Sequence, residues 1–151
     1  MAPRGCVFPP RRRSTVPTLQ KAGPDRKEGE RLLLESQEID LTTIGRKTGR
    51  PRTVELWFVY EDGVVWLMTG KDRNGPTSHW ARNLQATPEA SLKIGRTVFR
   101  AKATRVDDME ARLPVLMDAY RAKYGETTVH QFYDGSPRMP IALRITWPRM
   151  K

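Results

Sequence analysis

The sequence predicts a mainly β, α+β fold: a small closed or split antiparallel barrel of about six strands with a few flanking helices. Two hairpin signals support this prediction. They are Glu61-Asp62-Gly63 and Gly95-Arg96, and each lies between two runs of β-type residues. Two segments show helical periodicity. With 151 residues, the chain has the size of one domain with one hydrophobic core.

The expected strands follow one another closely, with turn residues between them. They are rich in β-branched and aromatic residues, which favour a pleated, half-buried surface. Proline at position 148 ends the last strand. The strands are expected at Arg31–Glu35, Ile39–Ile44, Thr53–Tyr60, Val64–Thr69, Ser91–Ile94, Thr97–Val106 and Ile141–Trp147.

A short helix is expected between the two hairpins. Thr77 or Ser78 can cap its first turn, and the helix runs through Gln85. Trp80 and Leu84 lie four residues apart, so they share one face of this helix.

A second helix is expected in the C-terminal third of the chain. Asp107 or Asp108 offers the N-cap, an apolar stripe runs over residues 109–124, and Gly125 ends it. Pro114 lies inside the stripe, so a kink or two abutting helices are expected there.

The N-terminal segment differs in composition from the rest of the chain. Residues 1–24 hold five basic residues, five prolines and no acidic residue. This composition is typical of disordered chain. Residues 1–28 are therefore expected to form a disordered basic tail, and residues 29–151 the barrel domain. The tail could be an inert leader, or it could be an arm that contacts anionic lipid.

The net charge of +10 favours anionic partners: nucleic acid, a membrane surface or a charged cofactor. The single cysteine, Cys6, permits no intramolecular disulfide, which fits a reducing cytoplasm. No apolar run reaches the roughly 18 residues that a membrane span needs. His79 and His130 have no partners at ligand spacing, so no metal site is expected. Any redox chemistry would belong to a bound cofactor.

A strongly basic loop separates two of the expected strands. Gly45 and Gly49 allow a tight turn, and no acidic residue lies between them. Such a loop is placed to hold a phosphate or a carboxylate, and like charges repel one another unless an anion lies nearby. A solvated hairpin tip is the alternative. The four cationic residues are Arg46, Lys47, Arg50 and Arg52.

Three stretches carry a resemblance to a known family. They are Leu41–Arg52 (LTTIGRKTGRPR), Val54–Phe58 (VELWF) and Trp80–Glu89 (WARNLQATPE). Together they resemble the deazaflavin-dependent nitroreductase/quinone reductase family. Its members are split β-barrel proteins related to the pyridoxamine-phosphate-oxidase-like group. The resemblance implies coenzyme F420 as cofactor, with an anionic phosphate and an oligoglutamate tail.

The resemblance also implies a set of cofactor-binding residues. The basic loop would hold the phosphate and tail, the following strand would run beside the ring system, and two further motifs would complete the site. These residues are Arg46, Lys47, Thr48 and Arg52; Glu55, Leu56 and Trp57; Thr69, Gly70 and Lys71; and Trp80 and Asn83.

Structural roles are open for the same residues. Trp57 and Trp80 could pack in a core, and Thr48 could form a hydrogen bond within a local turn. The side-chain amide of Asn83 could brace the loop, and Lys71 could lie in a solvated loop.

Two of these positions carry specific expectations. Glu55, between apolar neighbours, must face solvent or a cation such as Arg52 or Arg46. Gly70 would let the backbone approach the cofactor closely, with Lys71 in reach of phosphate.

The implied reaction is hydride transfer from reduced F420 to an electron-poor acceptor, such as a quinone or a nitro compound. Relatives use C-terminal aromatic residues, often tyrosine, as proton donor or oxyanion partner. Tyr133 is the preferred catalytic candidate because residues 132–135 form a predicted loop, and a packed lid residue is the alternative. Tyr124 is the second candidate, and Tyr120 and His130 are further ones.

Other functions remain open on the sequence alone. A flavin mononucleotide (FMN) protein of the wider barrel group could use the same loop for one phosphate, although four cations exceed that need. A nucleic-acid-binding module would fit the charge, but basic residues interleaved with exposed aromatics are not evident. The resemblance also implies a homodimer.

Overall fold

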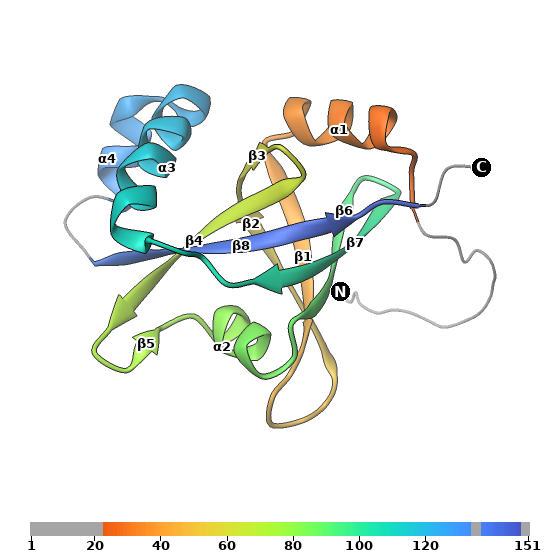
Figure 1. The fold of residues 1–151 in the computed structure, drawn as a ribbon, viewed down its shortest axis with the longest axis horizontal. Coiled ribbons are helices and arrows are strands. Elements are labelled where there is room, and N and C mark those ends of the chain that lie inside the picture. Colours follow the sequence, from red (N-terminus) through yellow and green to blue (C-terminus); the bar gives the residue numbers. More distant parts are fainter. Residues whose placement is uncertain (1–22, 134–136, 149–151) are drawn as a thin grey trace.

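The structure, a computed structural model, describes residues 23–133 and 137–148 of the chain. These residues form a curved antiparallel sheet flanked by helices (Figure 1). The helices are α1 (Arg26–Glu35), α2 (His79–Ala86), α3 (Met109–Tyr124) and α4 (Glu126–Tyr133). The strands are β1 (Glu38–Ile44), β2 (Pro51–Trp57), β3 (Val59–Glu61), β4 (Val64–Asp72), β5 (Gly75–Pro76), β6 (Glu89–Ile94), β7 (Thr97–Thr104) and β8 (Arg138–Thr146).

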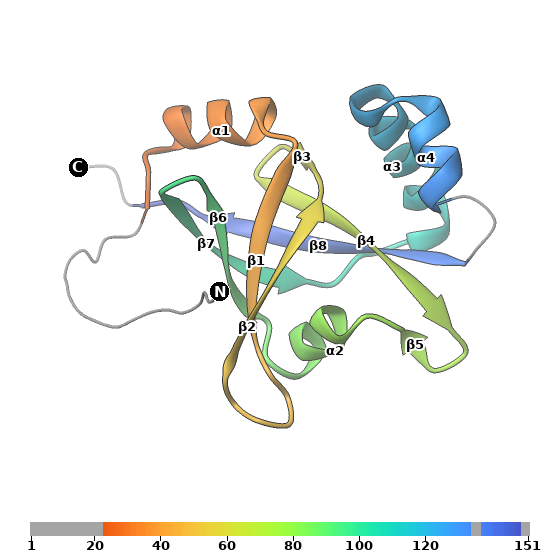
Figure 2. The same cartoon turned by 180° about the vertical axis from the view of Figure 1, so that it is seen from behind.

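The sheet is a split barrel. The strand order is β2-β1-β6-β7-β8-β4-β3, with β5 beside β4, and every pair is antiparallel. The sheet curls so that β1 lies across β8 and β4, behind them in Figure 1 and in front of them in Figure 2. The predicted fold class is confirmed, with eight strands where about six are expected.

Strand β4 separates two apolar cores. Val65 and Leu67 face an inner core inside the curl, and Val64, Trp66 and Met68 face a second core. Helices α3 and α4 cover this second core. Because strand side chains alternate between faces, β4 is buried on both. Side chains fill the barrel interior, so the loops and outer edges of the sheet are left for a binding site.

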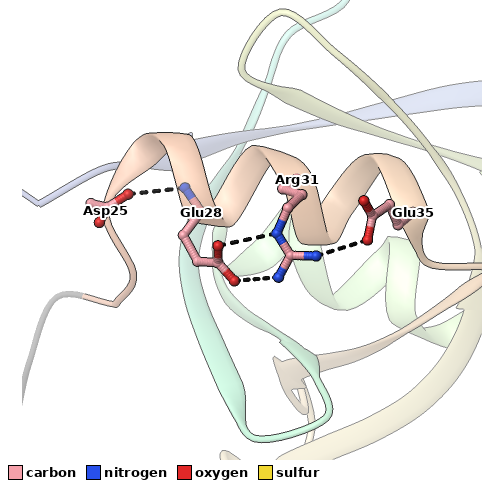
Figure 3. A network of polar contacts seen from close by, with 4 residues as sticks. All are labelled: Asp25, Glu28, Arg31 and Glu35. Atoms are coloured by element: carbon pink, nitrogen blue, oxygen red, sulfur yellow. Dashed lines mark hydrogen bonds and ion pairs between the residues drawn. The ribbon is translucent and has the colours of Figure 1, made fainter.

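The expected strand Arg31–Glu35 is wrong, because these residues belong to α1. The Asp25 carboxylate caps the helix and accepts a hydrogen bond of 2.9 Å from the Glu28 N–H. Arg31 then bridges Glu28 and Glu35 along one exposed side (Figure 3). These pairs at spacings of three and four are a helical signal, and it outweighs the short apolar run.

The ends of several elements differ from prediction. The expected strand Thr53–Tyr60 breaks at Phe58 into β2 and β3. Helix α1 begins at Arg26, so the expected boundary between residues 28 and 29 falls inside it. Residues 1–22, with Cys6, lie outside the described part of the chain.

The helices also depart from prediction in detail. Helix α3 continues through Pro114 and is one helix, and its N-cap Asp108 makes no side-chain capping bond. Helix α4 follows directly, so Tyr133 ends a helix where a loop is expected. Across residues 23–133 and 137–148, none of the helices has the length and apolar character that crossing a membrane requires.

Candidate functional site

The basic loop joins β1 to β2 at one end of the barrel, and its backbone forms a defined turn (Figure 2). The Gly45 N–H donates to the Arg50 carbonyl at 2.8 Å, and the Gly49 N–H donates to the Gly45 carbonyl at 2.7 Å. Thr48 Oγ1 accepts a hydrogen bond of 3.2 Å from the Arg50 N–H. Gly49 has a φ of 72°, which favours glycine. The turn leaves the side chain of Lys47 exposed.

Arg46 is tied to helix α2. Its backbone N–H and its guanidinium both donate to the side-chain oxygen of Asn83, at 3.1 and 2.9 Å. The guanidinium also lies 3.5 Å from the His79 carbonyl oxygen and 3.3 Å from His79 Nδ1. Asn83 is only 4% exposed, and its side-chain nitrogen donates to Thr43 Oγ1 at 3.2 Å. Helix α2 therefore holds the guanidinium of Arg46 in one orientation.

The positive charge of the loop has no acidic partner in the described chain. None of the loop cations lies within 4.0 Å of a described carboxylate. Clustered like charges that lack a counter-charge are an electrostatic cost unless an anion binds. The site is therefore suited to an anionic ligand. These cations are Arg46, Lys47, Arg50 and Arg52.

Strand β2 sends alternate side chains to opposite faces of the sheet. Arg52 lies across from the buried Thr43, on the inner face. Glu55 lies on the other face, across from Asp40, and is exposed. Glu55 therefore meets solvent, and an ion pair between Glu55 and Arg52 or Arg46 is absent from the described residues.

The end of β4 packs against the start of α2. Thr69 is buried, and its hydroxyl donates to Ser78 Oγ at 2.6 Å. A Cβ on Gly70 would lie 2.9 Å from Thr77 Oγ1, so the close approach at this glycine is made by Thr77. Thr77 therefore fills the space that the missing side chain of Gly70 leaves, and a contact of Gly70 with the cofactor stays a prediction. Lys71, the next residue, is exposed.

An oriented arginine in a cationic loop, at the rim of a filled split barrel, suits an anionic coenzyme. Residues 12–141 match the family model of the F420H(2)-dependent quinone reductase. The chain belongs to this family. It is an F420-dependent oxidoreductase, which confirms the sequence resemblance.

Solved structures share the fold of this family member. A conserved hypothetical protein from Mycobacterium tuberculosis is 24% identical, with a TM-score of 0.59 over 85% of this chain and 91% of that chain. An F420 reductase is 22% identical, with a TM-score of 0.53 over 78% and 92%. A FAD-binding protein from Mesorhizobium loti is 15% identical, with a TM-score of 0.57 over 82% and 89%. These likenesses support the split-barrel assignment.

The aromatic residues of the family motifs pack into the protein. Trp57 packs against the second core and stacks on Tyr124, with ring centroids 4.7 Å apart. Leu56 and Trp80 are half-buried and pack against the inner core. Both tryptophans therefore pack against a core, as the alternative interpretation expects, and a contact of either ring with the cofactor stays a prediction. The contacts of Asn83 match its alternative role as a bracing amide.

The candidate catalytic residues of this oxidoreductase lie on α3 and α4, away from the basic loop (Figure 2). The Tyr124 hydroxyl accepts a hydrogen bond of 3.1 Å from the Phe58 N–H. Tyr120 is fully buried. His130 is exposed, and Tyr133 is the last residue of α4.

Sequence reasoning missed two residues near Arg46. His79 contacts its guanidinium directly, and Thr43 anchors Asn83. One signal for His79 was available: it precedes Asn83 by four residues, so both side chains share one face of α2. No local signal identifies Thr43, because its partner lies 40 residues away.

Proposed function

We propose that this protein transfers a hydride from reduced F420 to a quinone or an activated nitro compound, and that the basic loop holds the coenzyme's phosphate and oligoglutamate tail. When bound, the reduced coenzyme supplies the hydride. The supporting observation is the group of four loop cations without a carboxylate partner in the described chain. A tail of several carboxylates can pair with all four cations, whereas a single phosphate needs fewer of them.

The basic residues would bind the coenzyme in different ways. Arg46 offers a planar fork that Asn83 already orients, which suits a phosphate or a carboxylate. Lys47 is exposed and offers a mobile point charge. Arg52 adds a second fork on the inner face of β2. Thr48 would shape the turn, since its hydroxyl accepts from the loop backbone.

Neighbouring residues would serve the rest of the coenzyme. Leu56 and Trp80 present half-buried apolar surface, which would exclude water from the ring system. Exposed Lys71 would reach a phosphate. Glu55 has no such role in this proposal, because it lies on the opposite face of β2 from Arg52.

Tyr133 is our candidate for the proton donor. Tyr124 is less suited to that task because its hydroxyl already lies 2.5 Å from the Gln37 carbonyl oxygen and 3.0 Å from that of Phe58. We therefore assign Tyr124 a structural role, in which it holds the backbone where β2 ends.

We also expect a homodimer, located in the cytoplasm. Strand β2 ends the sheet, and residues 51–55 are exposed, with Val54 37% exposed. Native proteins usually cover such an edge, and a second copy would do so. A contact between the basic N-terminal segment and anionic lipid stays a prediction, as does the absence of a nucleic-acid partner.

A titration of purified protein with F420 tests the binding proposal through the coenzyme's fluorescence. The variant Arg46→Ala/Lys47→Ala should lose about 1.5–3 kcal/mol of binding free energy for each charged hydrogen bond removed. A matched control is Lys93→Ala/Arg96→Ala, which removes the same charge from the exposed β6–β7 hairpin. The control should bind F420 like the unmodified protein.

Equal affinities for the loop variant and the unmodified protein would exclude the loop as the tail-binding site. The same titration with FMN tests the alternative, because FMN carries one phosphate and should bind more weakly. Reduced F420 assayed against a panel of quinones and nitroaromatic compounds then identifies the acceptor class. Absence of turnover with every acceptor would contradict the proposed reaction.

A further inference from the structure

Among the described residues, none of the partners of the Arg46 side chain is a carboxylate. Its guanidinium lies within hydrogen-bond distance of the Asn83 amide oxygen, the His79 carbonyl oxygen and His79 Nδ1. Arginine held inside proteins is commonly paired with a carboxylate, which matches its fork and neutralises it. Here an amide occupies the place where an aspartate of nearly the same shape would bind more strongly.

Asn83 is not placed to bind a ligand itself. Its side chain is buried, and its oxygen already accepts two hydrogen bonds, both from Arg46. Its nitrogen donates to Thr43 on β1. The amide is thus held between a rigid strand and the loop, and it reaches the binding site through Arg46.

The base of this arrangement is firmly packed. Helix α2 is joined to β4 by the hydrogen bond between Thr69 and Ser78, and its Leu84 lies in the inner core. Arg46 N–H and guanidinium then converge on one atom of this helix. A side chain fixed in this way loses little conformational entropy when an anion binds.

We propose that Asn83 is a positioning residue for the coenzyme: it fixes the guanidinium of Arg46 without neutralising its charge. The inference rests on the proposed function, in which the loop binds the anionic part of F420. It replaces the expected direct contact of Asn83 with the cofactor. It also gives a reason why an amide, and not a carboxylate, occupies position 83.

The substitution Asn83→Asp isolates the charge from the geometry. An aspartate can accept the same two hydrogen bonds from Arg46 and one from the Thr43 hydroxyl, so the thermal unfolding temperature should change little. The added carboxylate neutralises Arg46, so the Kd for F420 should rise about 10- to 100-fold. The dependence of Kd on salt should become shallower, because one fewer charge is available to the ligand. A purely structural role would not change this slope.

Two further variants separate the contributions. Gln85→Glu adds the same charge to an exposed position of α2 and should change Kd less than about threefold, because exposed charges are screened. Thr43→Val removes the partner of the Asn83 side-chain nitrogen and adds no charge. It should raise Kd about three- to tenfold, through weaker positioning, with an unchanged salt dependence.

A double-mutant cycle with Arg46→Ala decides the inference. If Asn83 acts through Arg46, then Asn83→Asp should change the F420 Kd less than about twofold in the Arg46→Ala background. An equally large effect in both backgrounds would overturn the inference, and so would an Asn83→Asp variant that binds like the unmodified protein. If Arg46→Ala itself leaves Kd unchanged, the proposed function of the loop fails instead.

Discussion

Lys123 lies over the ring of Phe58. Its Nζ is 3.6 Å from the ring centroid and donates a hydrogen bond of 2.8 Å to the Phe58 carbonyl oxygen. The adjacent Tyr124 bonds to the same backbone, at the Phe58 N–H. The last turn of α3 thus holds the backbone of Phe58 in place between β2 and β3, where the regular strand hydrogen bonding is interrupted.

The Lys123 contact predicts a pH-dependent stability. Burial lowers the pKa of Lys123 from 10.5 to about 8. Below pH 8 the ammonium is charged in both states, and burial opposes folding. Between pH 8 and 10.5 only the unfolded chain keeps the proton, so the free energy of unfolding should rise. We expect a rise of about 1–2 kcal/mol, because the Phe58 ring and carbonyl offset part of the burial and solvent screens the rest. Urea unfolding at several pH values measures it.

The matched control for this prediction is Lys123→Met, which keeps the length of the side chain and cannot titrate. Its stability should not rise between pH 8 and 10.5. Lys102→Met, at an exposed position of β7, should keep the rise seen in the unmodified protein. A rise of equal size in Lys123→Met would assign the effect to another group.

Tyr124→Phe removes the hydroxyl that bonds to the backbone of Phe58 and Gln37. Loss of these bonds should destabilise the protein by about 1–3 kcal/mol, since it leaves the N–H of buried Phe58 without its partner. Urea unfolding measures the loss. Turnover of a quinone under conditions where the variant is folded should stay within about threefold of normal. A large loss of turnover without a loss of stability would instead give Tyr124 a catalytic role.

Gly45→Ala tests the shape of the basic loop. A Cβ at this position would lie 2.7 Å from Thr48 Oγ1 and 3.3 Å from the Arg50 carbonyl oxygen. The turn must shift, so the Kd for F420 should rise, by about tenfold if one charged hydrogen bond is lost. The double variant Gly45→Ala/Thr48→Ala removes the shorter contact and should recover part of the affinity. Unchanged binding by Gly45→Ala would show that the ligand does not depend on this turn.

Gly29→Ala tests whether steric crowding in α1 outweighs the gain in helix propensity. Alanine in a helix is favoured over glycine by about 1 kcal/mol. In α1, however, the new Cβ would lie 2.6 Å from the Trp147 ring and 3.0 Å from the Phe99 ring. Overpacking costs about 1–3 kcal/mol, so the variant should be less stable in thermal unfolding. In a Trp147→Leu background the contact with Trp147 is gone and the one with Phe99 remains, so the same substitution should cost less stability. An equal cost in both backgrounds would disprove the packing argument.

The sequence by itself determined the features that depend on neighbouring residues. Alternating apolar runs and Asp-Gly or Gly-Arg turns located β1, β3–β4 and the β6–β7 hairpin, because strand and turn preferences act over a few residues. The glycine-bounded loop with its four cations was visible in the same way. The three sequence motifs also identified the family, and the match to the family model over residues 12–141 confirms it.

Only the tertiary structure decided which side chains meet. Arg46 and Asn83 lie 37 residues apart in the chain, and Tyr124 and Phe58 lie 66 apart. Contacts over such distances arise when the sheet curls and the helices dock on it, and no local periodicity records them. The same packing gave Gly70 its close neighbour, Thr77. Asn83 is the clearest case: the motif marks it as part of the site, but the structure assigns it to Arg46, because burial and two converging donors occupy its oxygen.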